Sequence, residues 1–512
     1  MLESKAKQNI VIKSVPTDAA SPEQQNETLS PQVLDAYREL AKRYAIDDFE
    51  LAVQAIGGPG ENSYGSVLKV RLTPTSAPTK SAALQTLHTI LKIAPTSPAR
   101  RAHMRVKDMY TREVFMYANV FSEFAALHAP HAEAVARAPF SAAPQMLYAT
   151  LKNDAEFIIF EDLTAVAFAI NSRTNLPTYD LVVCAFRALA QLHAMSFVLQ
   201  ARQPTRFAAL VAQMDDNLFT ADMEEVSVEF GKKYVRRTRH LLEADLKLSG
   251  EDTPQMREVL LALHKIEDNF QGICMNAVNG AEYGPYSVIC HGDFWNNNIL
   301  YKFDSSNKQR NTAIKAKLID FQISRYSPPI LDLVHYLYAC TEKPLRDAHF
   351  NEFMQIYYDT LAQFIREYEL DPAILYPEAI FRQQLRQFGV YGYCMSAFAV
   401  PFFVSNASEL PDLDKVSEAI QELSSSSSSS SSDCSDTDEA NDDGRGVQSA
   451  VAQQRQKSNH HKTMSTKSQS AAELVDELDI LTERTLPIFK RRMIGNILDL
   501  QKYDMLEAIL KY

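Results

Sequence analysis

The chain contains 512 residues, of which 46% are hydrophobic and 23% are charged, and this is enough for about two or three domain-sized units with a sizeable core. Its formal net charge of −12 argues against binding to nucleic acid or to anionic membranes, because both attract an excess of Lys and Arg. The six cysteines form neither a CxxC pair nor a Cys/His pair at zinc spacing, which predicts reduced thiols and a cytoplasmic protein.

The N-terminal part predicts a small antiparallel sheet. Residues 1–30 are polar, lack an apolar core long enough for a signal peptide, and are expected to form a flexible leader. Helical spacing of apolar residues begins at Pro31. Short β-like runs separated by turn-forming residues then predict an antiparallel meander, formed by FELAVQAIG (49–57), SVLKVRLT (66–73) and LQTLHTILKIAP (84–95).

The rest of the chain predicts a second, mainly helical lobe. A helix over residues 105–124 and two strands within residues 144–163 complete an N-lobe that spans residues 31–163. Helical patterns dominate residues 164–423, the expected C-lobe, and return over residues 471–512 as its C-terminal helices. The predicted fold class is therefore α+β, with an antiparallel sheet plus helix in one lobe and helices in the other.

Two segments have an unusual composition. Residues 424–470 contain an unbroken Ser run and an acidic stretch with almost no large apolar side chains, which predicts a disordered insertion. Residues 388–404 carry no charge and are nearly long enough to span a bilayer. Their Tyr, Cys, Ser and Pro content favours a buried helix, so we expect no membrane span.

The strongest chemical signal is HGDFWNNN at residues 291–298, followed by an apolar strand and a second strand that ends at Asp320. Asp293 on such a loop can accept a hydroxyl proton, whereas Asn298 and Asp320 offer the hard oxygen ligands that Mg²⁺ prefers. A single carboxylate here is equally compatible with capping a strand. The combined spacing is specific, and it predicts phosphoryl transfer with Asp293 as base and the other two as metal ligands.

A nucleotide site is predicted upstream. The glycine-rich hairpin at residues 57–66 offers backbone N–H groups, together with Asn62 and Ser66, that can cover phosphates. Lys92 lies in an apolar strand and needs an anionic partner, which Glu113 in the following helix can provide. Alone, these features also suit a simple turn and a strand-edge lysine, and their order along the chain is what favours the nucleotide site.

Further polar residues were assigned from their surroundings. FIIFEDL ends a strand where the lobes would join, so the backbone groups of Glu161 and Leu163 can bind an adenine edge. His193 is expected to be a hydrogen-bonded core histidine, and Asp332 to cap a helix or hold the loop that carries Asp293. A solvated face is expected for the cluster of basic residues Arg100, Arg101, Arg105, Lys107 and Arg112.

These motifs make the chain resemble the ecdysteroid kinase-like family of insects, a branch of the choline kinase and aminoglycoside phosphotransferase group. The resemblance covers about residues 30–420 and 470–512, and it is carried in order by GENSYGS, TILKIAP, TREVFMY, FIIFEDL, LAQLHAMS, HGDFWNNNILY and LIDFQISRYSPPILDLVHYL. It implies a two-lobed protein-kinase-like fold that uses ATP and Mg²⁺. It also implies the family's roles for Lys92, Glu113, Asp293, Asn298 and Asp320.

The implied activity is transfer of the γ-phosphoryl group of ATP to a hydroxyl of a lipophilic alcohol of ecdysteroid or xenobiotic type. A choline or ethanolamine kinase is the alternative enzyme, although Gln322 stands where such kinases usually carry an acidic residue. A catalytically weak pseudokinase or scaffold is the alternative from a different class. The Ser-rich insertion is outside the family pattern and leaves a regulatory partner open.

An apolar substrate requires an apolar pocket, which we expect in the C-lobe opposite Asp293. The uncharged segment at residues 388–404 is a candidate wall, and aromatic side chains suit lipophilic ligands. A core position is an equally good interpretation for each of its aromatic residues. The candidates are Tyr391, Tyr393, Phe398, Phe402 and Phe403, with Trp295 near the reacting hydroxyl.

Overall fold

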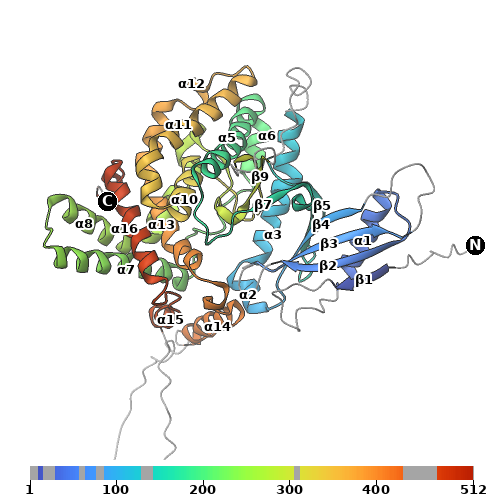
Figure 1. Ribbon diagram of the computed structural model, residues 1–512, viewed down its shortest axis with the longest axis horizontal. Helices are drawn as coiled ribbons and strands as arrows, with labels where there is room; N and C mark the ends of the chain where they lie inside the picture. The colour runs from blue at the N-terminus through green and yellow to red at the C-terminus, as the bar shows by residue number, and fades with distance from the viewer. Residues whose placement is uncertain are drawn as a thin grey trace, which may run out of the picture.

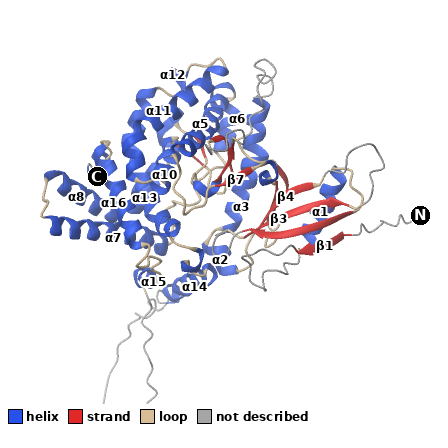
Figure 2. Cartoon of the chain, in the orientation of Figure 1, coloured by secondary structure: helices blue, strands red, loops and turns tan. Residues whose placement is uncertain are grey.

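The N-lobe is built on one six-stranded sheet (Figures 1 and 2). The structure is a computed structural model that describes residues 10–14, 29–56, 64–75, 86–127, 142–304, 312–429 and 470–510. All neighbouring strands are antiparallel except the first pair, which is parallel. In spatial order the strands are β1 (Ile10–Ser14), β2 (Phe49–Ile56), β3 (Ser66–Pro74), β4 (Leu87–Ile93), β6 (Phe157–Glu161) and β5 (Met146–Thr150).

The predicted meander and the two later strands are confirmed, but the leader prediction was wrong at one point. Residues 10–14 form β1, which pairs with β2 in the register Ile10 to Phe49. The reason is local, since IVIK is rich in the β-branched residues that favour strands. The strand was not predicted because it is only five residues long and lies between polar segments.

Helix α1 (Pro31–Arg43) begins where the apolar spacing predicted it. The Ser30 side chain accepts a hydrogen bond from the Val33 amide, and Pro31 occupies the first turn, as expected at a helix start. Its buried face packs on the sheet, and the Tyr37 hydroxyl lies 2.8 Å from Thr89 Oγ1. This contact fixes the helix on β4, the strand that also carries Lys92.

The segment between β4 and β5 links the two lobes. It forms α2 (Pro98–His103), α3 (Val106–Phe115) and a π-helical turn, η2 (Met116–Val120). Tyr110 and Val106 of α3 are fully buried in the same hydrophobic core as the C-lobe helices. The core is therefore continuous across the junction, which gives the helix a fixed position against the C-lobe.

The C-lobe is mainly helical, as predicted (Figure 2). Two small antiparallel sheets carry its loops: β7 (Phe168–Ile170) with β9 (Ile299–Phe303) and β10 (Ala313–Leu318), and β8 (Val288–Cys290) with β11 (Arg325–Ser327). Its helices are α5 (Tyr179–Arg202), α6 (Pro204–Val211), α7 (Glu225–Ser249), α8 (Pro254–Asp268), α9 (Phe270–Val278), α10 (Ile330–Cys340), α11 (Lys343–Glu367), α12 (Pro372–Leu375), α13 (Glu378–Val404), α14 (Leu413–Ser429), α15 (Ala471–Glu477), α16 (Leu486–Lys502) and α17 (Glu507–Leu510).

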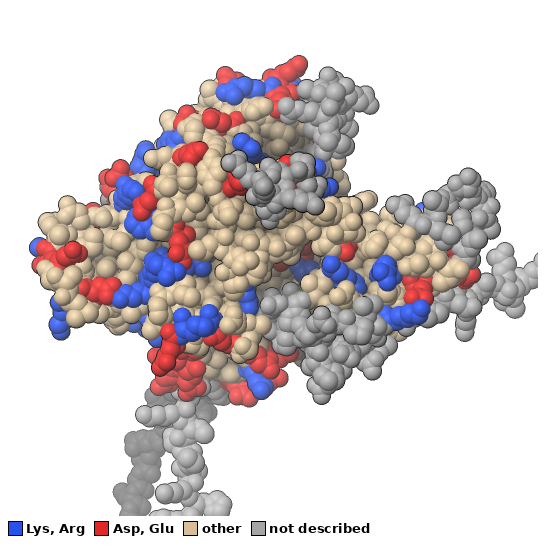
Figure 3. Space-filling view, viewed as in Figure 1, with Lys and Arg blue, Asp and Glu red and all other residues tan. Residues whose placement is uncertain are grey.

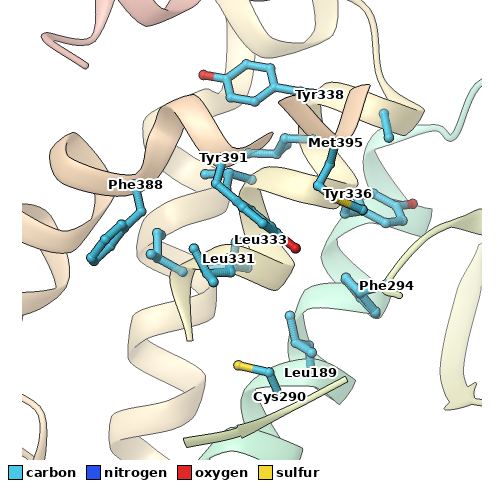
Figure 4. Close-up of a cluster of buried hydrophobic side chains, with 14 of the residues drawn as sticks. Leu189, Cys290, Phe294, Leu331, Leu333, Tyr336, Tyr338, Phe388, Tyr391 and Met395 are labelled. Atoms are coloured by element: carbon cyan, nitrogen blue, oxygen red, sulfur yellow. The ribbon is translucent and has the colours of Figure 1, made fainter. Parts of the chain in front are cut away.

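The centre of the C-lobe is α10, which is buried along its whole length and packs against α13. Figure 4 shows part of this core, in which Tyr336 of α10 lies beside Met395 of α13. The rings of Phe294 and Tyr336 are 5.2 Å apart. Because α10 is buried on all sides, its position is fixed, and so is that of the polar residues it carries.

Two stretches, Tyr179–Arg202 and Pro372–Val404, are long and apolar enough to cross a membrane by length and composition alone. In the fold, 89% and 78% of their most apolar windows are buried. This is the behaviour of core helices, and it agrees with the buried helix predicted for residues 388–404.

Helix α14 extends beyond the predicted start of the Ser-rich insertion. It runs through Ser429, and the Ser424 hydroxyl donates to the Ile420 carbonyl one turn earlier. Such back-bonding lets serine fit into a helix. The chain is described again at Ser470, which caps α15 in a reciprocal bond pair with Glu473, and the prediction of disorder for residues 430–469 lies outside the described residues.

Candidate active site

The HGD loop, residues 291–298, is held by one carboxylate from α10. Asp332 accepts hydrogen bonds from the backbone amides of His291 at 2.7 Å and Gly292 at 2.9 Å. His193 Nε2 lies 3.1 Å from the same carboxylate, and His193 Nδ1 lies 2.7 Å from the Tyr357 hydroxyl. Burial opposes ionisation of Asp332, but its hydrogen bond to His193 lowers its pKa, so the loop is anchored by an anion.

This geometry confirms that His193 is a hydrogen-bonded core histidine and that Asp332 holds the loop. His193, Cys290 and Asp332 also lie close enough together to suggest a metal site. Both nitrogens of His193 and both oxygens of Asp332 already have hydrogen-bond partners. The cluster is therefore a structural support, and we assign no metal to it.

Gly292 has a backbone φ of 86°, and an added Cβ would lie 2.0 Å from the Ile323 carbonyl oxygen. Only glycine fits this turn without displacing the backbone. The neighbouring His291 accepts from the Asp293 amide through Nδ1 and lies 3.0 Å from the Ile319 carbonyl through Nε2. Burial lowers the pKa of His291, which keeps it neutral and makes Nε2 the donor that ties the loop to the segment containing Asp320.

Asp293 is hydrogen-bonded to Asn298, five residues further along the same loop. The Asn298 side-chain amide donates to both the backbone carbonyl and the carboxylate of Asp293, each at 2.9 Å. Burial raises the pKa of Asp293 to about 7, and the nearby charge of Asp320 adds to this effect. A carboxyl group with this pKa can exchange a proton near neutral pH.

Lys92 connects the two lobes at the site. Its ammonium lies 2.7 Å from Glu113 Oε2, 2.7 Å from Asp320 Oδ1 and 3.1 Å from Gln322 Oε1. Burial alone would lower the pKa of Lys92, but the charges of Asp320 and Glu113 raise it above its usual value. Burial raises the pKa of Glu113 to about 7, and we favour the ionised pair because the lysine keeps its proton.

The described part of the glycine-rich hairpin approaches β4 closely. Gly65 has a φ of 131°, and an added Cβ would lie 1.9 Å from the Ile93 carbonyl oxygen. Ser66 is exposed at the start of β3, opposite Ile93. Asn62, with Gly57, Gly58 and Gly60, lies outside the described residues. Next to Gly65, Tyr64 lines the same cavity as Asp293, a neighbour that the motif did not reveal.

The predicted adenine-binding segment lies at the end of β6. The Glu161 amide donates to the Gln145 carbonyl, and the Glu161 carboxylate accepts from the Gln145 amide at 2.9 Å. Both the amide and the carboxylate of Glu161 are thus engaged with Gln145. Leu163 follows in a 3₁₀ turn and packs with Leu300 in a small apolar cluster at the lobe junction.

A cavity of about 600 Å³ opens beside Asp293. Its apolar wall includes Phe398, Phe402 and Phe403 of α13, and the Trp295 ring stacks on Phe403 at 4.2 Å. These four predicted pocket residues are confirmed as lining residues. Polar and charged side chains that also line the cavity include His103, Arg105, Asn217, Asp222, Glu224, Gln322 and His335.

Two aromatic residues predicted as pocket walls are core residues instead. Tyr391 is 2% exposed and accepts a hydrogen bond from buried Arg325, and Tyr393 is fully buried. Figure 4 shows Tyr391 among the side chains of the core. Tyr391 lies on the same face of α13 as Phe398 but about two turns earlier, beside Arg325, whereas Tyr393 lies on the opposite side of the helix from Phe402, because the side chains follow a period of 3.6 residues.

The cavity is not confined to the C-lobe, contrary to the prediction. Ala102, Met104 and Met109 of the N-lobe line one side, and Leu413 and Ile420 of α14 line another. Acidic side chains gather over α14 and α15 at the outer surface (Figure 3). The pocket therefore lies between the α2–α3 segment and the C-lobe helices.

The basic residues expected on a solvated face mostly bind partners. Arg112 is 8% exposed and donates to the carbonyls of Ser324 at 2.7 Å and Asp215 at 2.8 Å in the C-lobe. Arg101 binds Glu156 within the N-lobe, whereas Lys107 is exposed as predicted. The prediction was wrong because a charged cluster on one helix looks the same in sequence whether it faces water or a second lobe.

Two further basic side chains cross the lobe junction at the cavity. His103 Nδ1 lies 2.5 Å from the Glu224 carboxylate, and Arg105 lies 3.5 Å from that of Asp222. Both acidic partners precede α7 in the C-lobe. Asp222 and Glu224, unlike Asp293 in the same pocket, are thus paired with basic side chains of the N-lobe.

Comparison with known proteins places this geometry in a family. The chain resembles solved structures of aminoglycoside 2′-phosphotransferase-IIIa with GDP, at 14% identity and a TM-score of 0.32 over 75% of this chain and 97% of that one for a mutant. For the wild-type protein the identity is 12% and the TM-score 0.30, over 76% of this chain and 99% of that one. No curated protein matches. The model of the ecdysteroid kinase-like family matches residues 59–370, more than half of the sequence, and the chain therefore belongs to that family.

Proposed function

We propose that this chain is a kinase that transfers the γ-phosphoryl group of ATP to a hydroxyl of a lipophilic small molecule. One observation carries the proposal. The Lys92 ammonium binds Glu113 and Asp320 beside the Asp293–Asn298 pair, and Asp293 opens into a largely apolar cavity. A lysine suited to bind phosphate, a carboxylate suited to take up a proton and a pocket large enough for a small-molecule substrate thus lie next to one another.

The nucleotide side of the site fits ATP with Mg²⁺. Asp320 offers a carboxylate, and the Asn298 amide group is used on Asp293, so that its side-chain carbonyl oxygen is the atom for a metal. Such hard oxygen donors suit Mg²⁺, which would neutralise charge on the phosphates when bound. Lys92 would exchange its contact with Asp320 for the phosphates, while Glu113 keeps the ammonium in place.

Asp293 is the proposed general base. Its carboxylate is oriented by Asn298 and lies in the cavity that would hold the acceptor hydroxyl. It accepts the hydroxyl proton as the oxygen attacks the γ-phosphorus, and the bond to the leaving ADP oxygen breaks. A raised pKa makes the carboxylate a better proton acceptor than an exposed aspartate.

The pKa of Asp293 gives a pH prediction. Only the ionised form accepts a proton, so kcat/KM should fall by about tenfold per pH unit below the pKa of about 7. We expect a single acid limb in a plot of log kcat/KM against pH, because that ratio reports the free enzyme. A flat profile between pH 5 and pH 7, with the protein folded throughout, would argue against Asp293 as the base.

The cavity supports a neutral, lipophilic acceptor. Aromatic side chains of α13 form its wall, and its acidic residues Asp222 and Glu224 are paired with Arg105 and His103. A cationic substrate would need a second carboxylate without a basic partner besides the proposed base Asp293, and Gln322 binds Lys92 through its side-chain oxygen. These contacts favour an ecdysteroid-like or xenobiotic alcohol over choline or ethanolamine.

Removing part of the aromatic wall should weaken acceptor binding. Phe402 is half-buried, lines the cavity and stacks on Phe230, so Phe402→Ala is expected to raise KM for a steroid alcohol by about 10- to 100-fold. Nucleotide binding should remain as in the wild type. The matched control is Phe381→Ala, a fully buried core residue, which should lower stability by about 3–5 kcal/mol without a selective effect on KM.

The scaffold alternative makes a different prediction. An active kinase should be stabilised by ATP with Mg²⁺, since a ligand that binds only the folded state raises the melting temperature. We expect a clear thermal shift with ATP and Mg²⁺ and a smaller one with ATP and EDTA. Equal melting temperatures with and without nucleotide would favour the scaffold, and a phosphotransfer screen against steroid and xenobiotic alcohols would then complete the test.

A cytoplasmic location is also proposed. The five cysteines within the described ranges are free and buried, which suits a reducing compartment: Cys184, Cys274, Cys290, Cys340 and Cys394.

A further inference from the structure

Two buried polar atoms at the cavity have no hydrogen-bond partner. They are His335 Nδ1 and Asn217 Oδ1, and their residues are 2% and 8% exposed. Both residues line the cavity that contains Asp293. An unpaired buried polar atom costs about 1–3 kcal/mol, so atoms of this kind in a cavity wall indicate a missing partner.

Both atoms are hydrogen-bond acceptors. The side-chain nitrogen of Asn217 donates to the Gln322 carbonyl at 3.0 Å, which identifies the unpaired atom as the amide oxygen. His335 forms its other hydrogen bond with the backbone of Gly292. Burial lowers the pKa of His335 to about 4, so the ring is neutral and carries one proton. Because Nδ1 has no partner, Nε2 is the nitrogen that faces Gly292 and holds this proton, which leaves a lone pair on Nδ1.

The two acceptors flank the proposed reaction centre. His335 lies one turn after Asp332 on α10, and its bond to Gly292 places it against the residue before Asp293. Asn217 is bonded to Gln322, which itself binds Lys92. Asn217, His335 and Asp293 line one cavity, so a substrate that fills this cavity is in reach of all three residues.

We propose that His335 and Asn217 are specificity-determining residues that accept hydrogen bonds from a second donor group of the substrate. The cavity then selects apolar molecules with at least two hydroxyl groups over matching mono-alcohols, and it disfavours carboxylates, which have no proton to donate at neutral pH. This inference rests on the proposed kinase function for its kinetic consequence. Ligand binding to the cavity does not depend on it.

Two variants separate the acceptor atom from the support of the loop. In His335→Gln the amide reaches the position of Nε2 and can keep the bond to Gly292, but the Nδ1 acceptor is lost. In His335→Asn the amide reaches the position of Nδ1 and can keep the acceptor, but the bond to Gly292 is lost. The pair therefore distinguishes recognition of the second hydroxyl from positioning of the HGD loop.

The probes are an androstanediol and the matching androstanol, which differ by one hydroxyl. For the wild type we expect kcat/KM for the diol to exceed that for the mono-alcohol by about 10- to 100-fold. The reason is that the bound mono-alcohol leaves the two acceptor atoms without a hydrogen bond, whereas the diol supplies one. His335→Gln should reduce this ratio to near one, and His335→Asn should keep most of it while lowering kcat for both alcohols. Binding of each alcohol is measured in parallel by calorimetry.

The outcomes separate this inference from the kinase function. A wild type that phosphorylates both alcohols with the same kcat/KM overturns the inference and leaves the kinase intact, since water would then satisfy the two acceptors. A preference that persists in His335→Gln also overturns it. If neither alcohol is phosphorylated but the diol binds more tightly in the wild type and not in His335→Gln, the acceptor site stands and the kinase function fails.

Discussion

Replacing Asp293 with Asn is expected to slow phosphotransfer by roughly 10²- to 10⁴-fold, the usual contribution of a general base. Asparagine has nearly the same shape as aspartate, but it cannot take up the hydroxyl proton. Its side-chain oxygen can still accept the hydrogen bond from Asn298, so the loop geometry should persist. The measurement is kcat under saturating ATP, with any alcohol that the screen identifies.

The same variant should not lose stability. Burial and the charge of Asp320 both disfavour the ionised form of Asp293, and a neutral amide removes that penalty. We expect an unchanged or slightly higher melting temperature and unchanged ATP affinity. Asp35→Asn, at an exposed ion pair with Arg38 on α1, is the matched control, and near-normal turnover in Asp293→Asn would refute the assignment.

The polar residues brought together at the site could be found from sequence because they lie in short motifs. HGDxxxxN fixes Asp293 and Asn298 within one loop, so that their hydrogen bonds follow from local geometry. Lys92 and Asp320 are 228 residues apart in sequence, and the order of motifs and the family resemblance assigned both residues to the site without predicting their 2.7 Å contact. Spacing alone gave no measure of that distance.

The errors have a common physical cause, which is that burial is not encoded by residue type alone. Arg112 reads as a surface residue, yet its guanidinium pairs with carbonyl groups of the other lobe. His335 lies in an apolar helix and had no signal of its own, because its function depends on a free Nδ1 atom in the folded cavity. The π-helical turn after α3 was not predicted either, because over five residues the spacing of apolar side chains does not differ between a π-helix and an α-helix.

Replacing Asp320 with Asn is expected to remove the magnesium dependence of nucleotide binding. Asp320 has a backbone φ of 67°, a conformation that Asn tolerates better than Ala, so this variant changes the charge with little strain. Without the carboxylate, the ratio between ATP affinity in Mg²⁺ and in EDTA should fall by at least about tenfold, which is about 1.4 kcal/mol. Titration calorimetry under both conditions measures the ratio.

Glu113→Gln is the matched control for this experiment, because Glu113 binds the same Lys92 ammonium at 2.7 Å without being a proposed metal ligand. Without the Glu113 carboxylate, the Lys92 ammonium loses one of its ion-pair partners and is held less rigidly. ATP binding should therefore weaken to a similar degree with Mg²⁺ and with EDTA. The two carboxylates therefore differ in one measurable respect, although both surround the same lysine. If Asp320→Asn kept the full magnesium dependence while Glu113→Gln lost it, the metal would be held on the side of Glu113, and the proposed roles of the two residues would have to be exchanged.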